Sequence, residues 1–176
     1  MLFRLIGACF VFASCACFGF CLSARDGLRI RELTEFKKAL LMLSSEIGYM
    51  KTTVPAAFSQ ISKRVSNPLR EFLAGFADSL EEGLRGGGLT AYELWSASLA
   101  SFRDRLHLYA EDADMLDDFG KTLGYLDTKM QLNAIALAVE YIGQKTGELS
   151  IRNEKNKRMY RSLGLLGGAL LAVVLW

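Results

Sequence analysis

Histidine and proline are scarce in this chain, and cysteine is confined to its first 21 residues. The single histidine and the position of the cysteines limit which metal, disulfide and catalytic sites the chain can form. The 176 residues include one histidine, His107, and two prolines. All four cysteines lie near the start of the chain, at Cys9, Cys15, Cys17 and Cys21. A disulfide framework would link cysteines within the folded domain, and a zinc site needs histidine partners or paired Cys-x-x-Cys spacing. The cysteines near the start of the chain fit neither pattern, so we expect neither site. No serine or cysteine is placed beside His107 by the sequence, so neither a catalytic dyad nor a cofactor is indicated.

Long runs of basic residues are also missing. The formal net charge is +2, and no Lys/Arg-rich stretch interleaved with aromatic residues is present. Proteins that capture nucleic acid need such a positive surface, so we expect no nucleic-acid partner. Alternating apolar and polar stretches of useful length are absent as well, which argues against β structure.

Apolar residues dominate both ends of the chain. From Leu2 to Leu22 the only charge is Arg4, and nothing after Arg161 is charged. About 20 apolar residues are enough to cross a hydrocarbon core of about 30 Å. We therefore expect residues 1–24 to form a transmembrane helix and residues 162–176 to form a second transmembrane or membrane-inserted helix. The shorter C-terminal tail leaves open whether it spans the bilayer fully.

A cleaved signal peptide is the alternative reading of the first segment. The stretch Phe12-Ala13-Ser14-Cys15 faintly resembles a lipoprotein cleavage site. The apolar run continues well past that stretch, which favours a retained anchor.

Basic residues flank the two apolar ends on the side of the central region. They are Arg25, Arg29 and Arg31 after the first segment, and Lys155, Lys157, Arg158 and Arg161 before the second. Positively charged flanks stay on the cytoplasmic side of a membrane. The chain is thus expected to have a cytoplasmic domain over residues 25–161, with both termini across the membrane.

Apolar residues in the central region recur at helical spacing. The first stripe comprises Leu33, Phe36, Leu40, Leu43, Ile47 and Met50, and the last comprises Leu132, Ile135, Val139, Ile142, Thr146 and Leu149. Between them, Pro55 in a first turn, Asn67-Pro68, and Thr90 with Glu93 as a capping box indicate further helix boundaries. Residues 83–88 are expected to form a flexible loop, and residues 151–158 a solvated turn of helix. We predict an all-α fold, an antiparallel bundle of about six helices flanked by the N- and C-terminal transmembrane helices.

The most distinctive local sequence is Phe119-Gly120-Lys121-Thr122-Leu123-Gly124-Tyr125-Leu126-Asp127, followed by Gln131. Gly120 and Gly124 allow close backbone approach, and we expect Gly124 to cap one helix and Asp127 to cap the next. The Gly-Lys-Thr triplet is not a phosphate-binding loop, because position 115 is methionine and no strand precedes it.

Other polar residues have mainly structural interpretations. The acidic cluster Glu111, Asp112, Asp114, Asp117 and Asp118 surrounds an expected helix start, where the helix dipole stabilises negative charge. A docking patch for a basic partner is the functional alternative. Glu46 is expected at a solvated or salt-bridged edge, with a partly buried acid as the alternative. Tyr49 and Trp95 are expected in the core.

The order and spacing of several of these residues resemble one known family. Glu46-Ile47-x-Tyr49, Pro55 with Phe58, Trp95, the Phe119 to Asp127 block with Gln131, and the glycines Gly164 and Gly168 near the apolar end are similar to the stage III sporulation protein AB family. The resemblance covers nearly the whole chain, and its cysteine-rich first segment is the unusual departure. Within this pattern Gly164 and Gly168 also have the spacing of a close helix contact in lipid.

The resemblance implies a non-enzymatic platform in a secretion or channel complex between mother cell and forespore. That family is similar to the cytoplasmic domains of type II secretion and type IV pilus platform proteins. The implied partners are the mother-cell membrane facing the forespore, a secretion ATPase like stage III sporulation protein AA, and other channel components. The alternative function is a membrane-tethered extracytoplasmic sensor or ligand-binding domain. The candidate interaction residues are Glu46, Tyr49, Pro55, Phe119, Gly120, Leu123, Gly124, Asp127, Gln131, Gly164 and Gly168.

Overall fold

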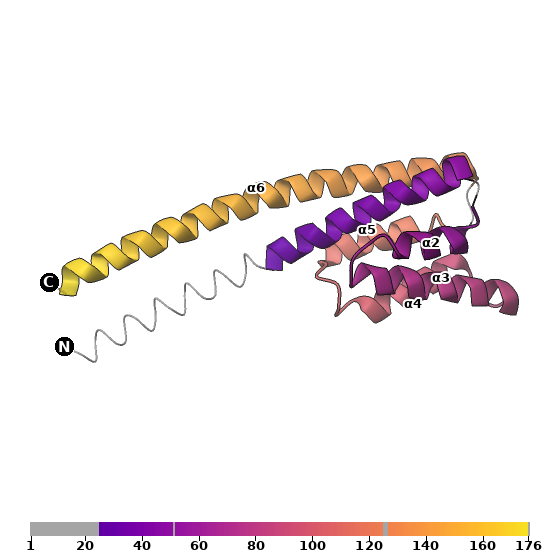
Figure 1. Ribbon diagram of the computed structural model, residues 1–176, viewed down its shortest axis with the longest axis horizontal. Helices are drawn as coiled ribbons and strands as arrows, with labels where there is room; N and C mark the ends of the chain where they lie inside the picture. Colours follow the sequence, from indigo (N-terminus) through magenta and orange to yellow (C-terminus); the bar gives the residue numbers. More distant parts are fainter. Residues whose placement is uncertain (1–24, 51, 125–126, 176) are drawn as a thin grey trace. The chain divides into compact units, whose positions relative to one another are not determined.

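The computed structural model describes residues 25–50, 52–124 and 127–175, apart from the side chains of Leu84 and of residues 160–175. These residues form helices and no strand (Figure 1). A helix over residues 25–45 passes directly into the π-helix η1 (Glu46–Met50). The α-helices that follow are α2 (Val54–Ser62), α3 (Leu69–Gly86), α4 (Ala91–Phe102), α5 (Ala110–Gly120) and α6 (Thr128–Leu175). The prediction of an all-helical chain is therefore confirmed.

The chain divides into two compact units. The larger unit is Arg31–Thr146, and the smaller unit joins residues up to Ile30 with residues from Gly147 onward. The predicted segment 1–24 lies outside the described residues, as do the side chains of 162–176. Within the part of the chain that the structure describes, no helix is both long and apolar enough to cross a membrane.

The core of the larger unit is built around Trp95 on α4. Its side chain is 1% exposed and meets four phenylalanine rings, at centroid distances of 4.9 Å to Phe76, 5.1 Å to Phe72, 5.6 Å to Phe119 and 6.0 Å to Phe58. Three of these pairs meet edge to face, the geometry in which one ring's positive edge contacts the other's negative face. The prediction that Trp95 is a core residue is confirmed.

The helix over 25–45 buries most of its predicted stripe. Leu33, Phe36, Leu40 and Leu43 are buried, and Ile47 in η1 continues the stripe. Met50 and Tyr49, which we predicted to be buried, are exposed. For Met50 the reason is η1, because a π-helix turns less per residue than an α-helix and so shifts the register of the stripe. Tyr49 lies two positions after Ile47, about 200° around an α-helix, so helical geometry already turns it away from the stripe. The sequence pattern alone assumed that α-helical periodicity continued.

The ends of α3 and α4 differ in how well the sequence predicts them. The predicted loop over residues 83–88 is wrong in extent, because α3 continues through Gly86 and ends at Gly87, whose φ of 67° is left-handed. Gly83 lies inside α3, and a Cβ there would lie 2.9 Å from Leu94, so α3 and α4 approach closely at this position. The capping box at the start of α4 is confirmed, since the Thr90 hydroxyl accepts from the Glu93 amide and the Glu93 carboxylate accepts from the Thr90 amide.

The smaller unit pairs the start of the first helix with the later part of α6. A Cβ on Gly27 would lie 4.0 Å from Nδ2 of Asn153, so the two helices approach closely there. Asn153 and Arg29 are both buried. The predicted solvated turn over 151–158 is therefore wrong at Asn153, which faces the neighbouring helix, although most of its neighbours in that stretch are exposed.

Candidate functional site at the turn end of the bundle

Three links of the larger unit meet at one end, which we call the turn end. Its described residues are η1 with its link to α2 (46–50 and 52–53), the α3 to α4 link (87–90) and the α5 to α6 turn (121–124 and 127). A Cβ on Gly48 would lie 3.7 Å from Leu132 near the start of α6, and one on Gly124 would lie 3.2 Å from Cβ of Ala91. Figure 1 shows η1, the end of α3 and the start of α6 at this same end. Nine of the eleven candidate residues predicted from sequence lie in the turn end or within four residues of it along the chain; the other two are Gly164 and Gly168.

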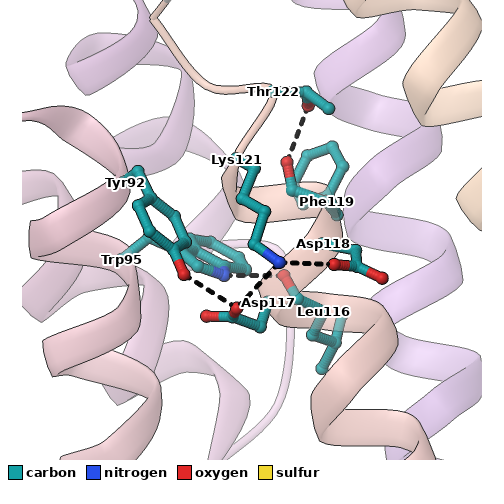
Figure 2. A network of polar contacts seen from close by, with 8 residues as sticks. All are labelled: Tyr92, Trp95, Leu116, Asp117, Asp118, Phe119, Lys121 and Thr122. Atoms are coloured by element: carbon teal, nitrogen blue, oxygen red, sulfur yellow. Dashed lines mark hydrogen bonds and ion pairs between the residues drawn. The ribbon is translucent and has the colours of Figure 1, made fainter.

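The closest packing near the turn end joins Trp95 to Gly120. The indole Nε1 donates a hydrogen bond of 2.8 Å to the carbonyl of Leu116 on α5 (Figure 2). A Cβ on Gly120 would lie 2.2 Å from Cδ1 of Trp95, a distance that real Cβ atoms do not reach. Glycine at position 120 therefore makes room for an indole side chain, whereas the sequence suggested close approach of two backbones.

A polar network on the surface braces α4 against the end of α5. The Tyr92 hydroxyl donates a 2.9 Å hydrogen bond to Asp117, and Lys121 lies 3.6 Å from Asp117 and 2.7 Å from Asp118 (Figure 2). The hydrogen bond to Asp117 raises the pKa of Tyr92, and the bond to Asp118 raises the pKa of Lys121. Because the ammonium of Lys121 also sits at the C-terminal end of α5, it is favoured by the helix dipole.

The α5 to α6 turn uses the predicted residues in a modified way. Asp127 accepts a 2.8 Å hydrogen bond from the Met130 amide, so its predicted role as the cap of the next helix is confirmed. Gly124 does not cap α5, because α5 ends at Gly120 and a turn follows over residues 121–124. Its φ of 88° nevertheless requires glycine, since that backbone conformation strains other residues.

Glu46 is buried, contrary to our expectation of a solvated or salt-bridged edge. Its carboxylate accepts a 3.0 Å hydrogen bond from the hydroxyl of Thr52, which closes the link after η1. Glu46 is thus a structural residue that holds the shape of the link.

The remaining candidates fall into two groups. Phe119 and Leu123 are core residues, while Pro55 in the first turn of α2 and Gln131 on α6 are half-buried. Gly164 and Gly168 lie in the part of α6 whose surroundings are outside the description, so their helix contact stays a prediction.

Large apolar side chains are exposed at the turn end. Tyr49 is 89% exposed, Met50 68%, Leu89 60% and Met130 52%. They come from η1, from the α3 to α4 link and from the first turn of α6. We call these four residues the exposed apolar set. Its members stand on links at the same end of the unit, near the contacts of Gly48 with Leu132 and of Gly124 with Ala91, and large exposed apolar side chains on such links are candidates for binding another protein.

A metal site requires several His, Cys, Asp or Glu side chains close together. Within the described residues no group of three or more such side chains is placed to hold a metal ion. The carboxylate of Glu32 accepts hydrogen bonds from His107 at both its amide (2.6 Å) and its Nδ1 (2.7 Å), which fastens the loop between α4 and α5.

Most of the acidic cluster is engaged in structural contacts. Asp112 is buried and accepts a 3.0 Å hydrogen bond from the Tyr109 amide at the start of α5, and Glu111 pairs with Lys145. Asp117 and Asp118 belong to the network described above. The interpretation as charges at a helix start is therefore confirmed for Glu111 and Asp112, whereas Asp117 and Asp118 lie near the end of α5 and are bound by Tyr92 and Lys121.

Sequence reasoning missed the two contacts that organise the unit over long separations. Trp95 with Gly120 and Glu32 with His107 join residues 25 or more positions apart, for which one sequence contains no pairing signal. The glycine beside an apolar helix face was the available hint for the first contact, and the scarcity of histidine was the hint for the second.

Comparisons with known proteins agree with each other. The sequence model of the stage III sporulation protein AB family matches residues 4–176. Stage III sporulation protein AB of Bacillus subtilis (strain 168) is 31% identical over 172 residues, which cover 98% of each chain. A solved structure of stage III sporulation protein AB is similar with a TM-score of 0.65 and 28% identity, over 72% of this chain and 97% of that chain.

Proposed function

Because this chain belongs to the stage III sporulation protein AB family, and so has a sporulation-specific role, we propose that it is a platform component of a secretion or channel complex between mother cell and forespore. In this proposal the chain catalyses no reaction itself. It holds a cytoplasmic ATPase in position relative to the membrane part of the complex.

The exposed apolar set is the observation that carries this proposal. Tyrosine and methionine are frequent in the centres of protein interfaces, because they bury much area with few freely rotating bonds or adapt to the partner's shape. The Tyr49 ring is 89% exposed, so its burial in a partner would remove a large apolar area from water. We assign the turn end as the docking surface for a secretion ATPase like stage III sporulation protein AA.

The proposal places residues 1–24 and 162–176 in the mother-cell membrane that faces the forespore. Its support is the composition of these segments and the basic residues that flank them. The domain over residues 25–161 then lies in the mother-cell cytoplasm, where an ATPase has access to the turn end.

Co-purification of the full-length chain with the ATPase tests the docking surface. Both proteins are co-expressed, and the tagged chain is isolated in detergent. Met50→Asp should reduce the bound ATPase by roughly tenfold, since a charge replaces an apolar side chain at the interface. Leu137→Asp is the matched control, because Leu137 is also 68% exposed but lies on α6 outside the turn end.

The two variants separate docking from general effects on folding. Equal ATPase binding by Met50→Asp and the unmodified chain would show that the turn end is not the docking surface. Loss of binding in Leu137→Asp alone would move the docking surface to the outer face of α6.

A further inference from the structure

A groove of about 530 Å³ lies between the helix over 25–45 and α6, away from the turn end. Its floor is apolar and is formed by Leu41, Ile135, Ala136 and Val139. Leu41 is 51% exposed although its neighbour Leu40 is buried in the core. Leu41 is thus a large apolar side chain that the fold of one chain leaves in water.

The two walls of the groove carry opposite charges. Lys37 stands on the first helix and Glu140 on α6. The Lys37 ammonium lies 3.0 Å from the position of a Cβ on Gly143, so it reaches across to α6 where that residue has no side chain. Among the ion pairs of the described residues, neither Lys37 nor Glu140 takes part. Glu140 accepts a long hydrogen bond of 3.4 Å from Gln144 on its own helix.

We propose that this groove binds the same groove of a second copy of the chain about a two-fold axis running along it. Such an axis places the first helix of each copy against α6 of the other. Lys37 of one copy then faces Glu140 of its partner, and the pair forms twice. Leu41 of each copy lies near the axis, over the apolar floor of the other.

The charge pattern favours a second copy over a different protein. In a two-fold interface each patch must complement itself, so a basic wall and an acidic wall on opposite sides of an apolar floor are what the symmetry requires. A partner surface of one charge sign would be attracted to one wall and repelled by the other. The axis also leaves α6 of both copies running in the same direction, as two chains in one membrane require. The pairing itself does not depend on the proposed membrane attachment or on the ATPase.

Chemical cross-linking of the full-length chain in membranes tests the pairing. The four native cysteines are first replaced by alanine, and Leu41→Cys is then introduced and treated with a short bis-maleimide. A covalent dimer is expected, because the two sulfur atoms lie close to the axis. Leu137→Cys, which is more exposed but does not line the groove, is the matched control and should cross-link much less.

Charge reversal then identifies the partner. In the Leu41→Cys background, Lys37→Glu should lower the dimer fraction by about tenfold, because both symmetric pairs become repulsive, and Glu140→Lys should do the same. Co-expression of these two variants with tags of different size should restore a mixed dimer, since every pair across that interface again joins opposite charges. Restoration also shows that both variants fold.

Two results would overturn the proposal. A dimer fraction that neither Lys37→Glu nor Glu140→Lys changes would show that the groove is not the interface. Loss in both single variants without recovery in the mixed sample would mean that Lys37 and Glu140 do not face each other across two copies.

Discussion

Gly120→Ala places a methyl group inside the space that the Trp95 indole occupies. The added Cβ would lie 2.2 Å from Cδ1, 2.7 Å from Nε1 and 2.8 Å from Cγ of the ring. To reach an ordinary contact of 3.4 Å, the indole has to move by roughly 1 Å. It has little room to do so, because it is buried and touches four phenylalanine rings.

Two costs combine in this variant. Overpacking a well-filled core costs about 1–3 kcal/mol. Movement of the ring also lengthens the 2.8 Å bond from Nε1 to the Leu116 carbonyl, and a weakened buried hydrogen bond costs about 1 kcal/mol. We therefore expect the free energy of unfolding to fall by about 3 kcal/mol, which lowers the melting temperature by about 10 °C in a chain of this size.

Thermal unfolding of the full-length chain in detergent, followed by far-UV circular dichroism, measures this change. Gly75→Ala in the middle of α3 is the matched control, because a Cβ there has no neighbouring atom within 4 Å. That substitution should stabilise the chain by about 0.5–1 kcal/mol through helix propensity. If Gly120→Ala unfolds at the same temperature as Gly75→Ala, the packing of Trp95 on position 120 is refuted.

Four further substitutions test other contacts of the larger unit. The pKa of Glu93 is lowered mainly by its hydrogen bond from the Thr90 amide, and less by the bond from the Thr90 hydroxyl. The stabilisation by ionised Glu93 is fully present above pH 4.5, its ordinary pKa, and is lost as the pH falls through the lowered pKa. Chemical denaturation should therefore show that the stability lost in Glu93→Gln becomes smaller in acid. A loss of stability that does not change with pH would contradict this. Gly124→Ala should cost about 1–2 kcal/mol in the same assay, because φ is 88° there and Ala91 is close, and unchanged stability would show that the turn relaxes freely. Glu32→Ala should destabilise the chain more than His107→Ala, because the carboxylate also accepts the His107 amide; the reverse order would mean that the imidazole is held by something else.

The fold class followed from apolar spacing, and local end signals located several helix boundaries. The Thr90 capping box and Asp127 act within a few residues of themselves, so one sequence contains all the information they need. Stripes such as Leu33 to Leu43 are also local, because helical geometry alone decides which residues share a face.

The errors arose where geometry changes without a residue signature. The π-helix η1 follows an ordinary apolar stripe, and no residue type in Glu46–Met50 marks the change of period. It turns Met50 away from the buried stripe, and the exposed Tyr49 and buried Glu46 also differ from the expected core ring and solvated or salt-bridged carboxylate. The exposure of the candidate docking surface could therefore not be predicted from the sequence, although Tyr49 was among the candidate residues.

Long-range packing explains the rest. Gly120 was expected to sit at a close approach, but its neighbour is an indole from another helix, and only the folded chain identifies it. The loop over residues 83–88 was misjudged because three consecutive glycines suggest flexibility, while α3 continues to Gly86 and packs closely on Leu94 at Gly83.

Membrane topology of the α3 to α4 link tests the central claim, that the turn end faces an ATPase in the cytoplasm. Gly88 is the suitable position for a single cysteine, because a side chain there meets nothing within 4 Å, whereas Gly87 has a left-handed φ and Gly83 abuts Leu94. Gly88→Cys, in a chain lacking the native cysteines, is expressed in vegetative cells so that the outer membrane face is accessible. Leu2→Cys, which the proposed topology puts outside, is the control. The account predicts that Gly88→Cys reacts with a membrane-impermeant maleimide only after permeabilisation. Labelling in intact cells would contradict it and favour an extracytoplasmic sensor or ligand-binding domain.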